Sequence, residues 1–370
     1  MRVADMVAGR HHIPTETKLT FAQYADEWLR RHKADLGPTT YATYETALRV
    51  HLTPAFGSIR LGSLTQRDID EWRANEDEEA KRIAHAREDA ERRKAAGEKD
   101  VPEVKEHGLS PASINRYLQV LNAALNKAVQ WGYIARNPAQ GVAKVPLGRN
   151  QEEDMNTLSV EQVGQMLEAA PVTLYPLLLT AVLTGLRRGE LLALAWDDID
   201  FGASKIIVRR SLNRIKDGEA YKLVAAQPKS RKSRRVDMPP EVSAALKELP
   251  SRFAGGLVFC QNNGKPLDPD NLVKREFAAV LRKAKLPRIR FHDLRHTYAS
   301  LLFANGANVK YAQAMLGHSS ARVTLDVYAH LMPSEYQNEA AKLGALVFGT
   351  KCDRIDTEGM QGRGQVLARA

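Results

Sequence analysis

Apolar residues recur at three- and four-residue spacing through the first part of the chain, which is the periodicity of helices that bury one face. Four helices are predicted there, beginning near residues 19, 38, 64 and 110. Thr65 and Ser110 can cap the third and fourth, because a hydroxyl oxygen satisfies free N–H groups of the first turn. We expect Pro54 to end the second helix. Residues 19–147 are therefore predicted to form an all-helical domain after a short tail over 1–18.

The segment 76–107 departs from this pattern because it is almost entirely polar. Between Glu76 and Asp100, 16 of 25 residues are charged, and Ile83 is the only large apolar side chain. Acidic residues precede basic ones by four positions at Asp77 and Lys81, at Glu78 and Arg82, and at two further pairs, Glu88–Arg92 and Asp89–Arg93. This is the favourable orientation for ion pairs along a helix. We therefore predict a charged helical insertion that stays in solvent. A charged spacer is preferred over a partner-binding arm.

Helices and short strands alternate after a predicted linker over 148–156. The predicted helices cover 157–170, 175–183, 187–196 and, from Pro240, most of the chain to Phe348. The segments that alternate or are β-branched cover 205–211, 220–226 and 234–238. They predict a short antiparallel sheet. The fold class is thus mainly α with a small antiparallel sheet, in which a mixed α/β domain over 157–348 is followed by a flexible tail over 349–370.

Composition narrows the functional class. The chain has 370 residues, of which 44% are hydrophobic and 26% are charged, as in packed proteins. Its net charge of +10 favours a polyanionic partner, nucleic acid before membrane. Cys260 and Cys352 are too few for a disulfide framework and fit the reducing cytoplasm. No signal peptide is visible, and the longest apolar stretch is interrupted, so no contact with a membrane is expected.

Three short stretches carry residues suited to chemistry. They are Thr184-Gly185-Leu186-Arg187-Arg188-Gly189-Glu190, His292-Asp293-Leu294-Arg295-His296, and Leu316-Gly317-His318 followed ten residues later by Tyr328. Each alone is a weak signal, because a surface arginine or a histidine on a helix is common. Their order and spacing are more specific than any one of them.

This arrangement resembles the tyrosine recombinase family, the phage integrases and their bacterial chromosome-dimer-resolving relatives. The first stretch matches the family's T-G-x-R-x-x-E box and the second its H-x-L-R-H box, while Tyr328 falls on the nucleophile of a T-x-D-x-Y-x-H stretch. The turn Gln227-Pro228-Lys229-Ser230 resembles the hairpin that bears a catalytic lysine, with Lys232 as the rival. The resemblance implies catalytic roles for Arg187, Lys229, His292, Arg295, His318 and Tyr328, with Glu190 in support.

The resemblance also implies a chemistry. Two guanidinium groups, Arg187 and Arg295, would bind the non-bridging oxygens of a DNA phosphate through paired hydrogen bonds. Tyr328 would attack phosphorus and give up its proton, with His292 as the natural acceptor, since an ordinary tyrosine pKa is about 10. His318 would bind a phosphate oxygen. Lys229 would protonate the leaving 5′-oxygen. The resulting 3′-phosphotyrosine conserves the bond energy, so no nucleotide, metal or other cofactor is expected.

The implied architecture has two domains, a helical core-binding domain and a catalytic domain. The implied partners are double-stranded DNA attachment sites and a homotetramer on DNA, with a DNA-bending host factor and an excisionase as further candidates. A helix predicted at about 333–346 carries Leu343 and Leu346 on a face that in this family typically packs on a neighbouring protomer. The expected function is integration or excision of phage or mobile-element DNA in the bacterial cytoplasm.

The sequence departs from the usual pattern of the family in two respects, and three alternative functions stay open. Only about 18 residues precede the first helix, where many phage integrases carry an arm-binding domain, and the charged insertion is longer than the usual connection. The alternatives are a Xer-like resolvase or transposon recombinase, a type IB topoisomerase, and a DNA-binding protein without catalysis. Neither a G-x-x-x-x-G-K-[ST] loop nor an H-E-x-x-H motif occurs. The acidic run Asp197-Asp198-Asp200 is interpreted as a helix-to-strand turn.

Overall fold

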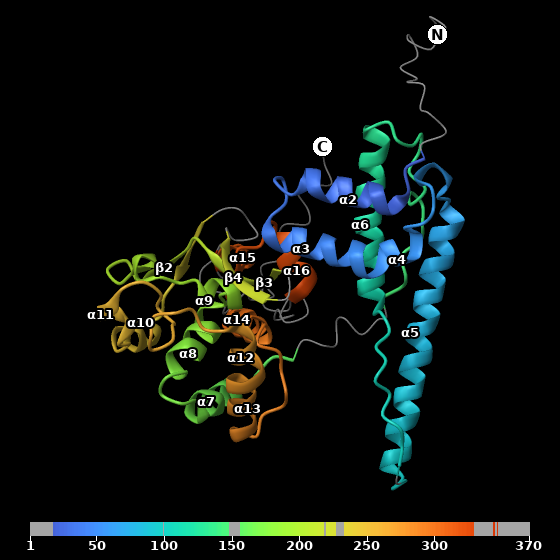
Figure 1. Cartoon of the computed structure of the whole chain (residues 1–370). Helices are drawn as coiled ribbons and strands as arrows, with labels where there is room; N and C mark the ends of the chain where they lie inside the picture. The colour runs from blue at the N-terminus through green and yellow to red at the C-terminus, as the bar shows by residue number, and fades with distance from the viewer. Residues whose placement is uncertain are drawn as a thin grey trace, which may run out of the picture.

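The computed structural model has two parts with separate hydrophobic cores, one helical and one mixed (Figure 1). It describes residues 18–98, 100–147, 156–217, 220–226 and 233–328, together with positions 343, 344 and 346. The predictions for the tail over 1–17, most of the linker and the tail over 349–370 lie outside the described residues. The fold class is confirmed as mainly α with small antiparallel sheets.

The first part contains the four predicted helical segments. Its elements are α2 (Phe21–His32), α3 (Pro38–Thr46), the π-helix η1 (Ala47–Leu52), α4 (Thr53–Phe56), the 3-10 turn η2 (Leu61–Ser63), α5 (Gln66–Ala95) and α6 (Pro111–Gln130). The predicted caps are present: the Thr65 side chain accepts from the N–H of Asp68, and that of Ser110 from the N–H of Ser113. Local hydrogen bonding therefore fixes where α5 and α6 begin.

The expectation that Pro54 ends the second helical segment is wrong. The chain stays helical through η1 and α4 to Phe56, and Pro54 lies in the first turn of α4. In the π-helical stretch the N–H of Thr53 bonds to the carbonyl of Leu48, five residues back. This shift in hydrogen-bond register places the proline, which has no N–H to donate, at a helix start where it is tolerated.

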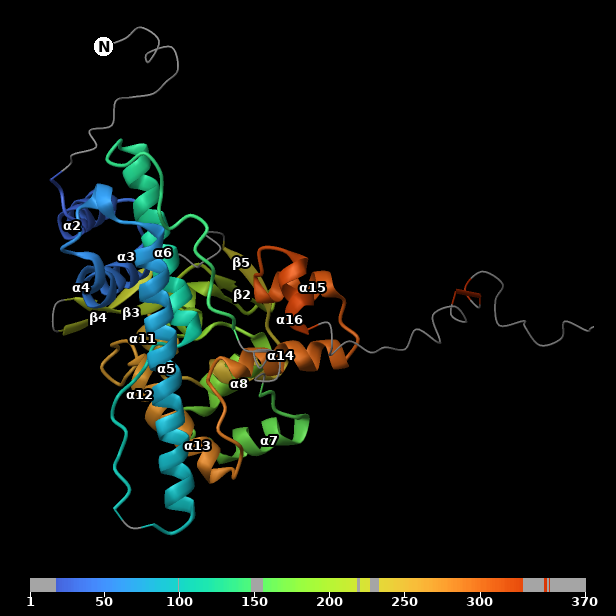
Figure 2. The same ribbon diagram turned by 90° about the vertical axis from the view of Figure 1, so that its right-hand side faces the viewer.

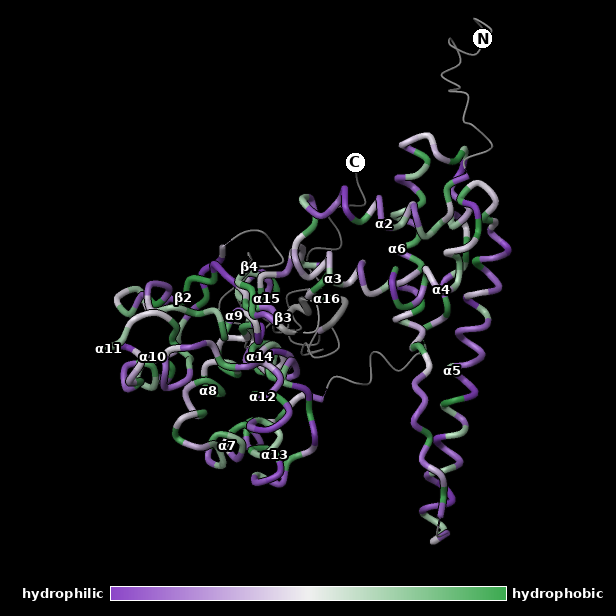
Figure 3. Tube along the Cα trace, in the orientation of Figure 1, coloured by the Kyte–Doolittle hydropathy of each residue, from purple (hydrophilic) through white to green (hydrophobic). Residues whose placement is uncertain are grey.

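Helix α5 extends the first part far beyond its core. It has 30 residues, and Figures 1 and 3 show its lower part projecting as a mostly hydrophilic rod beside the return segment 101–109. Ile69 and Trp72 enter the core, whereas Ile83 is the only buried apolar residue farther along the helix. The predicted helical insertion is therefore observed as a continuation of α5, although Ile83 is covered and not solvated.

Ion pairs along the extension follow the prediction only in part. Asp77 and Lys81 pair at 2.7 Å, as expected for a spacing of four. Arg82, however, contacts Glu79 at 2.7 Å and Glu106 of the return segment at 3.2 Å, instead of the expected Glu78. Arg82 therefore bonds both to its own helix and to the return segment. The second contact cannot be predicted from the spacing of residues along the helix.

Removing the extension is expected to leave the first part folded. The backbones of Ala80 and Gly108 are in close contact, since a Cβ built on Gly108 would be 2.5 Å from the Ala80 Cα. A short Gly/Ser connection can therefore join these two residues after deletion of 81–107. Ile83 is the only large buried side chain among the described residues that the deletion removes. We expect the free energy of unfolding, measured with urea, to fall by less than about 2 kcal/mol.

The matched control for that deletion is Ile69→Ala in the same helix. Ile69 is fully buried in the core of the first part, so its truncation is expected to cost about 2–5 kcal/mol. A deletion variant that loses as much stability as the control would show that the extension is part of the core.

The second part contains the remaining helices and all the described strands. Its helical elements are α7 (Val160–Ala169), α8 (Tyr175–Thr184), α9 (Arg188–Leu192), η4 (Trp196–Asp198), α10 (Pro240–Lys247), α11 (Ser251–Ala254), α12 (Pro269–Asn271), the π-helix η5 (Leu272–Phe277), α13 (Ala278–Lys283), α14 (Asp293–Ala304), α15 (Val309–Leu316) and α16 (Ala321–Tyr328). Its strands are β1 (Ile199–Asp200), β2 (Lys205–Val208), β3 (Ser211–Asp217), β4 (Ala220–Ala226) and β5 (Arg234–Asp237). Most of helix α8 is buried, and it packs against α14 and α10.

The strands form two sheets instead of the single predicted one. Strands β1, β2 and β5 make an antiparallel sheet, and β3 and β4 make a separate hairpin. The chain leaves the first sheet at Arg209 and Arg210, which pair with the buried carboxylate of Asp198 at 3.1 and 2.7 Å. Asp198 therefore fixes the corner between the sheets. This run is the predicted helix-to-strand turn, since η4 leads directly into β1.

The two parts contact each other where α3 lies against the β3–β4 hairpin (Figure 2). On the side of the first part, Asn115 of α6 exchanges two hydrogen bonds of 2.8 Å with the backbone of Val145. On the side of the second part, the N–H of Leu158 donates to Thr297 of α14 at 3.1 Å. Both ends of the linker are therefore held to helices.

Candidate functional site

Four segments of the second part converge on one cluster of side chains. They are the turn between α8 and α9, the first two turns of α14, the turn after α15 and the end of α16. Gly185 makes the first approach possible, because its φ is +62° and a Cβ there would lie 2.3 Å from the ring of Tyr298 in α14. The glycine of the T-G-x-R stretch is thus required by backbone conformation and by contact with α14.

Glu190 is the anionic centre of the cluster. Its carboxylate is 2% exposed and accepts from the backbone N–H of Arg187 at 2.9 Å and from the Arg187 guanidinium at 3.0 Å. Arg234 of β5 donates to both of its oxygens, at 2.8 and 2.7 Å. Arg234 also donates to the carbonyl of Met315 at 3.0 Å. The Glu190 carboxylate therefore links α9 to β5, and Arg234 connects both to the end of α15.

The ionisation of Glu190 follows from these contacts. Burial alone would raise its pKa, but the hydrogen bonds and positive charge of Arg234, with those of Arg187, outweigh burial and lower the pKa to about 2. The carboxylate is therefore charged at neutral pH and accepts hydrogen bonds only. The supporting role expected for Glu190 stays a prediction, and the contacts show only that its carboxylate binds Arg187 and Arg234.

Arg295 is held by backbone carbonyls instead of carboxylates. It is 3% exposed, and its guanidinium donates to the carbonyl of Gly185 at 2.7 Å and to that of Leu316. Burial, together with the nearby charges of Arg187 and Arg234, lowers its pKa to about 9, so it stays cationic at neutral pH. Two of its five N–H groups are used in this way.

His318 follows α15 and faces the same cluster. Its Nδ1 lies 2.9 Å from the hydroxyl of Thr324, which is fully buried in α16. Burial and the charges of Arg295 and Arg187 lower the pKa of His318 to about 4. The ring is therefore neutral at physiological pH, and its Nε2 is free to donate if Nδ1 accepts from Thr324.

Tyr328 lies at the end of α16 and is 1% exposed. Its hydroxyl is 2.8 Å from Nδ1 of His296, and its ring packs against Phe303. His292, the proton acceptor expected from the sequence, is exposed and contacts the His296 ring edge to face at 5.2 Å. The structure thus brings His296, and not His292, to the tyrosine hydroxyl.

Burial and positive charge act in opposite directions on the Tyr328 hydroxyl. Burial raises its pKa to about 12, while Arg295 and Arg187 partly offset this effect. The two arginines and the phenol therefore share one electrostatic environment, although no hydrogen bond joins them among the described contacts. A phenol in this state needs a nearby base before it can attack an electrophile.

Lys229 and Lys232 lie outside the described residues. The segment between β4 and β5, where both occur, therefore stays a prediction from the sequence. The described strands on either side end at Ala226 and begin at Arg234.

Sequence reasoning missed two members of the cluster, Arg234 and His296. The signal for His296 was its position one helical turn after His292, which puts both rings on one helix face. The signal for Arg234 was its alternation with Val236, since residues two apart in a strand face the same side and Val236 is buried. A charged residue on the inward face of a strand needs a partner, which here is Glu190.

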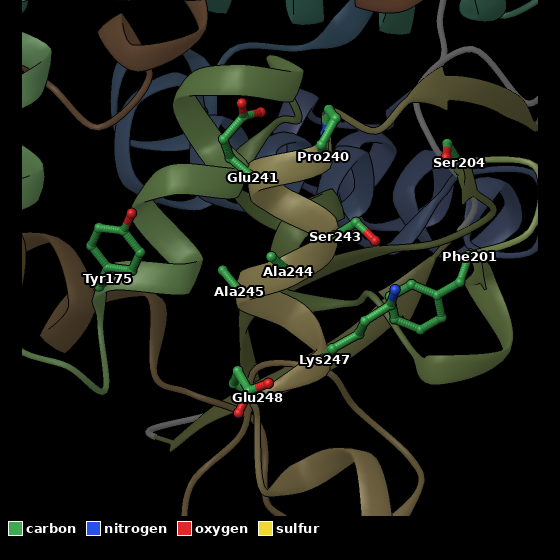
Figure 4. A pocket seen from close by; sticks show the side chains of 10 residues that line it. All are labelled: Tyr175, Phe201, Ser204, Pro240, Glu241, Ser243, Ala244, Ala245, Lys247 and Glu248. Atoms are coloured by element: carbon green, nitrogen blue, oxygen red, sulfur yellow. The ribbon is translucent and has the colours of Figure 1, made fainter.

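Other features of the described residues do not join this cluster. A hollow of about 770 Å³ runs along α10, between Tyr175 and Phe201, and shares no residue with it (Figure 4). No group of three or more potential metal ligands is present in the part of the chain that the structure describes. None of the helices described there combines the length and apolar character that a membrane span requires.

Comparison with known proteins gives consistent results for both parts. Residues 153–335 match the phage integrase family, and residues 20–75 match its N-terminal SAM-like domain. The chain is 34% identical over 266 residues to a protein of Caldanaerobacter subterraneus subsp. tengcongensis named "Tyrosine recombinase XerC-like", covering 65% of this chain and 68% of that one. It is 27% identical over 347 residues to the ICEBs1 integrase of Bacillus subtilis, covering 89% and 84%.

Solved structures share the fold. The Tn1549 transposon integrase in complex with transposon right end DNA has a TM-score of 0.65 at 24% identity, over 89% of this chain and all of that one. A lambda integrase tetramer bound to a Holliday junction has a TM-score of 0.54 at 17% identity, over 85% and 81%. The helical part and the mixed part are therefore both found in integrases of known structure.

Proposed function

Because the chain belongs to the phage integrase family and is a site-specific tyrosine recombinase, we propose that it cuts DNA at attachment sites through Tyr328. The observation that carries this proposal is the convergence of Tyr328 with two arginines and two histidines from separate elements. Positive charge at such a point matches a phosphodiester, whose charge grows as a nucleophile attacks. The expected product is a 3′-phosphotyrosine bond.

Each residue of the proposed site has a distinct role. Arg187 and Arg295 bind the non-bridging oxygens of the scissile phosphate, and Glu190 keeps Arg187 oriented. His318 donates to a phosphate oxygen, and His292, at the exposed edge of the cluster, contacts the DNA side of the same phosphate. Lys229 protonates the 5′-oxygen as it leaves, an assignment supported by the Pro228-Lys229-Ser230 stretch alone. A second 5′-hydroxyl then attacks the phosphotyrosine and joins the strands without a cofactor.

The domain organisation and partners follow from the same proposal. The helical part, over 19–147, acts as the core-binding domain and the mixed part, over 157–348, as the catalytic domain. We place the chain on double-stranded attachment sites as a homotetramer, supported by the fold it shares with a lambda integrase tetramer bound to a Holliday junction. The exposed side chains of Leu343 and Leu346 suit a contact with a second protomer. A DNA-bending host factor and an excisionase are candidate accessory proteins in the bacterial cytoplasm.

Integration of mobile DNA is preferred over chromosome-dimer resolution. The relative named as XerC-like aligns with 65% of this chain, whereas the ICEBs1 integrase aligns with 89% of it. The similarity to an integrase of mobile DNA therefore extends over more of this chain. The topoisomerase alternative is tested by strand exchange, because only a recombinase joins strands from two duplexes.

The test uses a library of nicked duplexes with a random core, incubated with the full chain in EDTA and without nucleotide. A nick beside the cleavage position releases a short fragment, so the covalent complex accumulates and survives denaturing electrophoresis. We expect selection to enrich one core sequence and mass spectrometry to place the adduct on Tyr328. The absence of any adduct, or an adduct on another residue such as Tyr336, would overturn the proposal.

A further inference from the structure

The hydrogen bond between Tyr328 and His296 joins two elements that are 32 residues apart. The tyrosine hydroxyl and Nδ1 of His296 are separated by 2.8 Å, and the two ring centroids lie 5.7 Å apart. The hydroxyl is covered by protein, since Tyr328 is 1% exposed. This contact therefore places a basic nitrogen directly on the oxygen that must lose a proton.

The His296 ring is held in position from several sides. Its helix is fixed at the next residue, where Thr297 donates to the carbonyl of Asp293 at 2.9 Å and accepts from Leu158. The His292 ring packs against the His296 ring with an interplanar angle of 84°, and the Tyr328 ring contacts it at 51°. These contacts hold the His296 ring with Nδ1 toward the tyrosine hydroxyl.

The protonation state suits a base. Burial lowers the pKa of His296 below its ordinary value, and Arg290 and Arg295 act in the same direction, while Asp293 opposes them. The imidazole is therefore neutral at pH 7, and with its proton on Nε2 it accepts at Nδ1. The other histidines are differently engaged, because His318 bonds to Thr324 and His292 contacts the His296 ring instead of the hydroxyl.

We infer that His296, and not His292, is the catalytic base that takes the proton of Tyr328 during DNA cleavage; this rests on the proposed function of Tyr328 as nucleophile. The bond from the tyrosine oxygen to phosphorus forms as the bond from phosphorus to the 5′-oxygen breaks. The phenolic proton passes to Nδ1 of His296, and the leaving 5′-oxygen takes a proton from an ammonium group, assigned above to Lys229. In strand joining the 5′-hydroxyl returns its proton to the amine, and His296 returns its proton to the tyrosine.

A base of this kind produces a specific pH dependence. The charged and titratable groups around the ring are Asp293, Arg290, Arg295, His292, His318 and Tyr328. The protonated imidazole cannot accept, so the single-turnover cleavage rate is expected to fall as the pH drops through the pKa of His296, on the acid side of 6.5. Above that pH this limb of the profile is flat.

The decisive variant is His296→Asn. His292→Asn is compared with it only in the shape of the pH profile, because His292 is itself assigned to the phosphate. Asparagine keeps a hydrogen-bond acceptor near the position of Nδ1 but cannot take a proton at these pH values. We expect His296→Asn to slow covalent attachment by at least about 100-fold and to remove the acid limb of the pH profile. His292→Asn is expected to keep that limb. A role for His296 in positioning alone would predict rescue by asparagine.

The substrate is the core duplex enriched by the full wild-type chain in the selection described above. If wild type forms no adduct, the proposed function fails; if wild type forms one and His296→Asn matches its rate, this inference fails. His296→Ala with added imidazole gives a second measurement, in which recovery of the rate supports the base. If the variants do not fold, nitrogen NMR of the histidines in the wild-type chain gives an independent test. A protonated Nδ1 on His296 at pH 7 would overturn the inference.

Discussion

Tyr328→Phe is expected to abolish covalent attachment to DNA while leaving duplex binding nearly unchanged. The substitution removes one hydroxyl, and phenylalanine has no atom that can bond to phosphorus. Affinity for DNA depends on the positive surface, which is untouched, so the dissociation constant is expected to stay within about threefold. Attachment is measured on denaturing gels and binding by mobility shift, both on the selected core duplex.

The matched control is Tyr311→Phe, which also removes a hydrogen-bonded hydroxyl. That hydroxyl donates to Asp237 at 3.0 Å and not to a residue of the cluster around Glu190 and Tyr328. Each substitution is expected to lower the free energy of unfolding by only about 1 kcal/mol, the usual net value of a hydrogen bond. Attachment that persists in Tyr328→Phe, or disappears in Tyr311→Phe, would reassign the nucleophile or show that the loss is structural.

Glu190→Gln is expected to be the most destabilising single polar substitution in the second part. The glutamine cannot balance the charge of Arg234, whose side chain is 10% exposed, and it disrupts the contact with Arg187. Breaking a buried ion pair by removing one partner costs about 3–5 kcal/mol, which urea unfolding measures directly. The surface variant Glu71→Gln, which loses an exposed pair with Arg67, is expected to cost about 0–1 kcal/mol.

The pH dependence of stability gives a second measurement of Glu190. Its pKa is about 2 in the folded chain and 4.5 as an ordinary glutamate, so its contribution is fully present above pH 4.5 and is lost as the pH falls toward 2. Glu190→Gln is expected to flatten that part of the stability profile. The double variant Glu190→Leu with Arg234→Met leaves no unpaired charge at the more buried Arg234. Only the more exposed Arg187 loses its partner, so the loss is expected to be smaller than in Glu190→Gln. A larger loss in the double variant would mean that packing, and not charge, dominates there.

The elements predicted correctly are those governed by neighbours in the sequence. Helices α5 and α6 begin where Thr65 and Ser110 indicated, because a capping side chain bonds to an N–H only three residues away. Helix α2 covers the stretch predicted from apolar spacing, and its Phe21, Tyr24 and Trp28 are buried. Of the predictions that failed, all but the one for Pro54 involve a group distant in the sequence.

The failures have identifiable causes. Arg82 was expected to pair with Glu78, but Glu106, 24 residues away, changes its orientation. The single predicted sheet became two because Asp198 holds Arg209 and Arg210 at the corner between them. Pro54 was expected to end a helix, yet a π-helical turn before it moved the hydrogen-bond register. Only the last of these arises within the local chain, and π-helical turns have no simple sequence signature.

The sequence by itself determined the family, the helical character of both parts and the candidate residues in its three motif stretches. It could do so because helix periodicity, capping and motif spacing are local properties that each stretch carries alone. The tertiary structure decided which of those residues touch. Glu190 meets Arg234 across 44 positions, and Tyr328 meets His296 instead of His292 across 32. Such pairs depend on how α14, α16, α9 and β5 pack together, and packing is set by the shape of the whole core, which no single segment encodes.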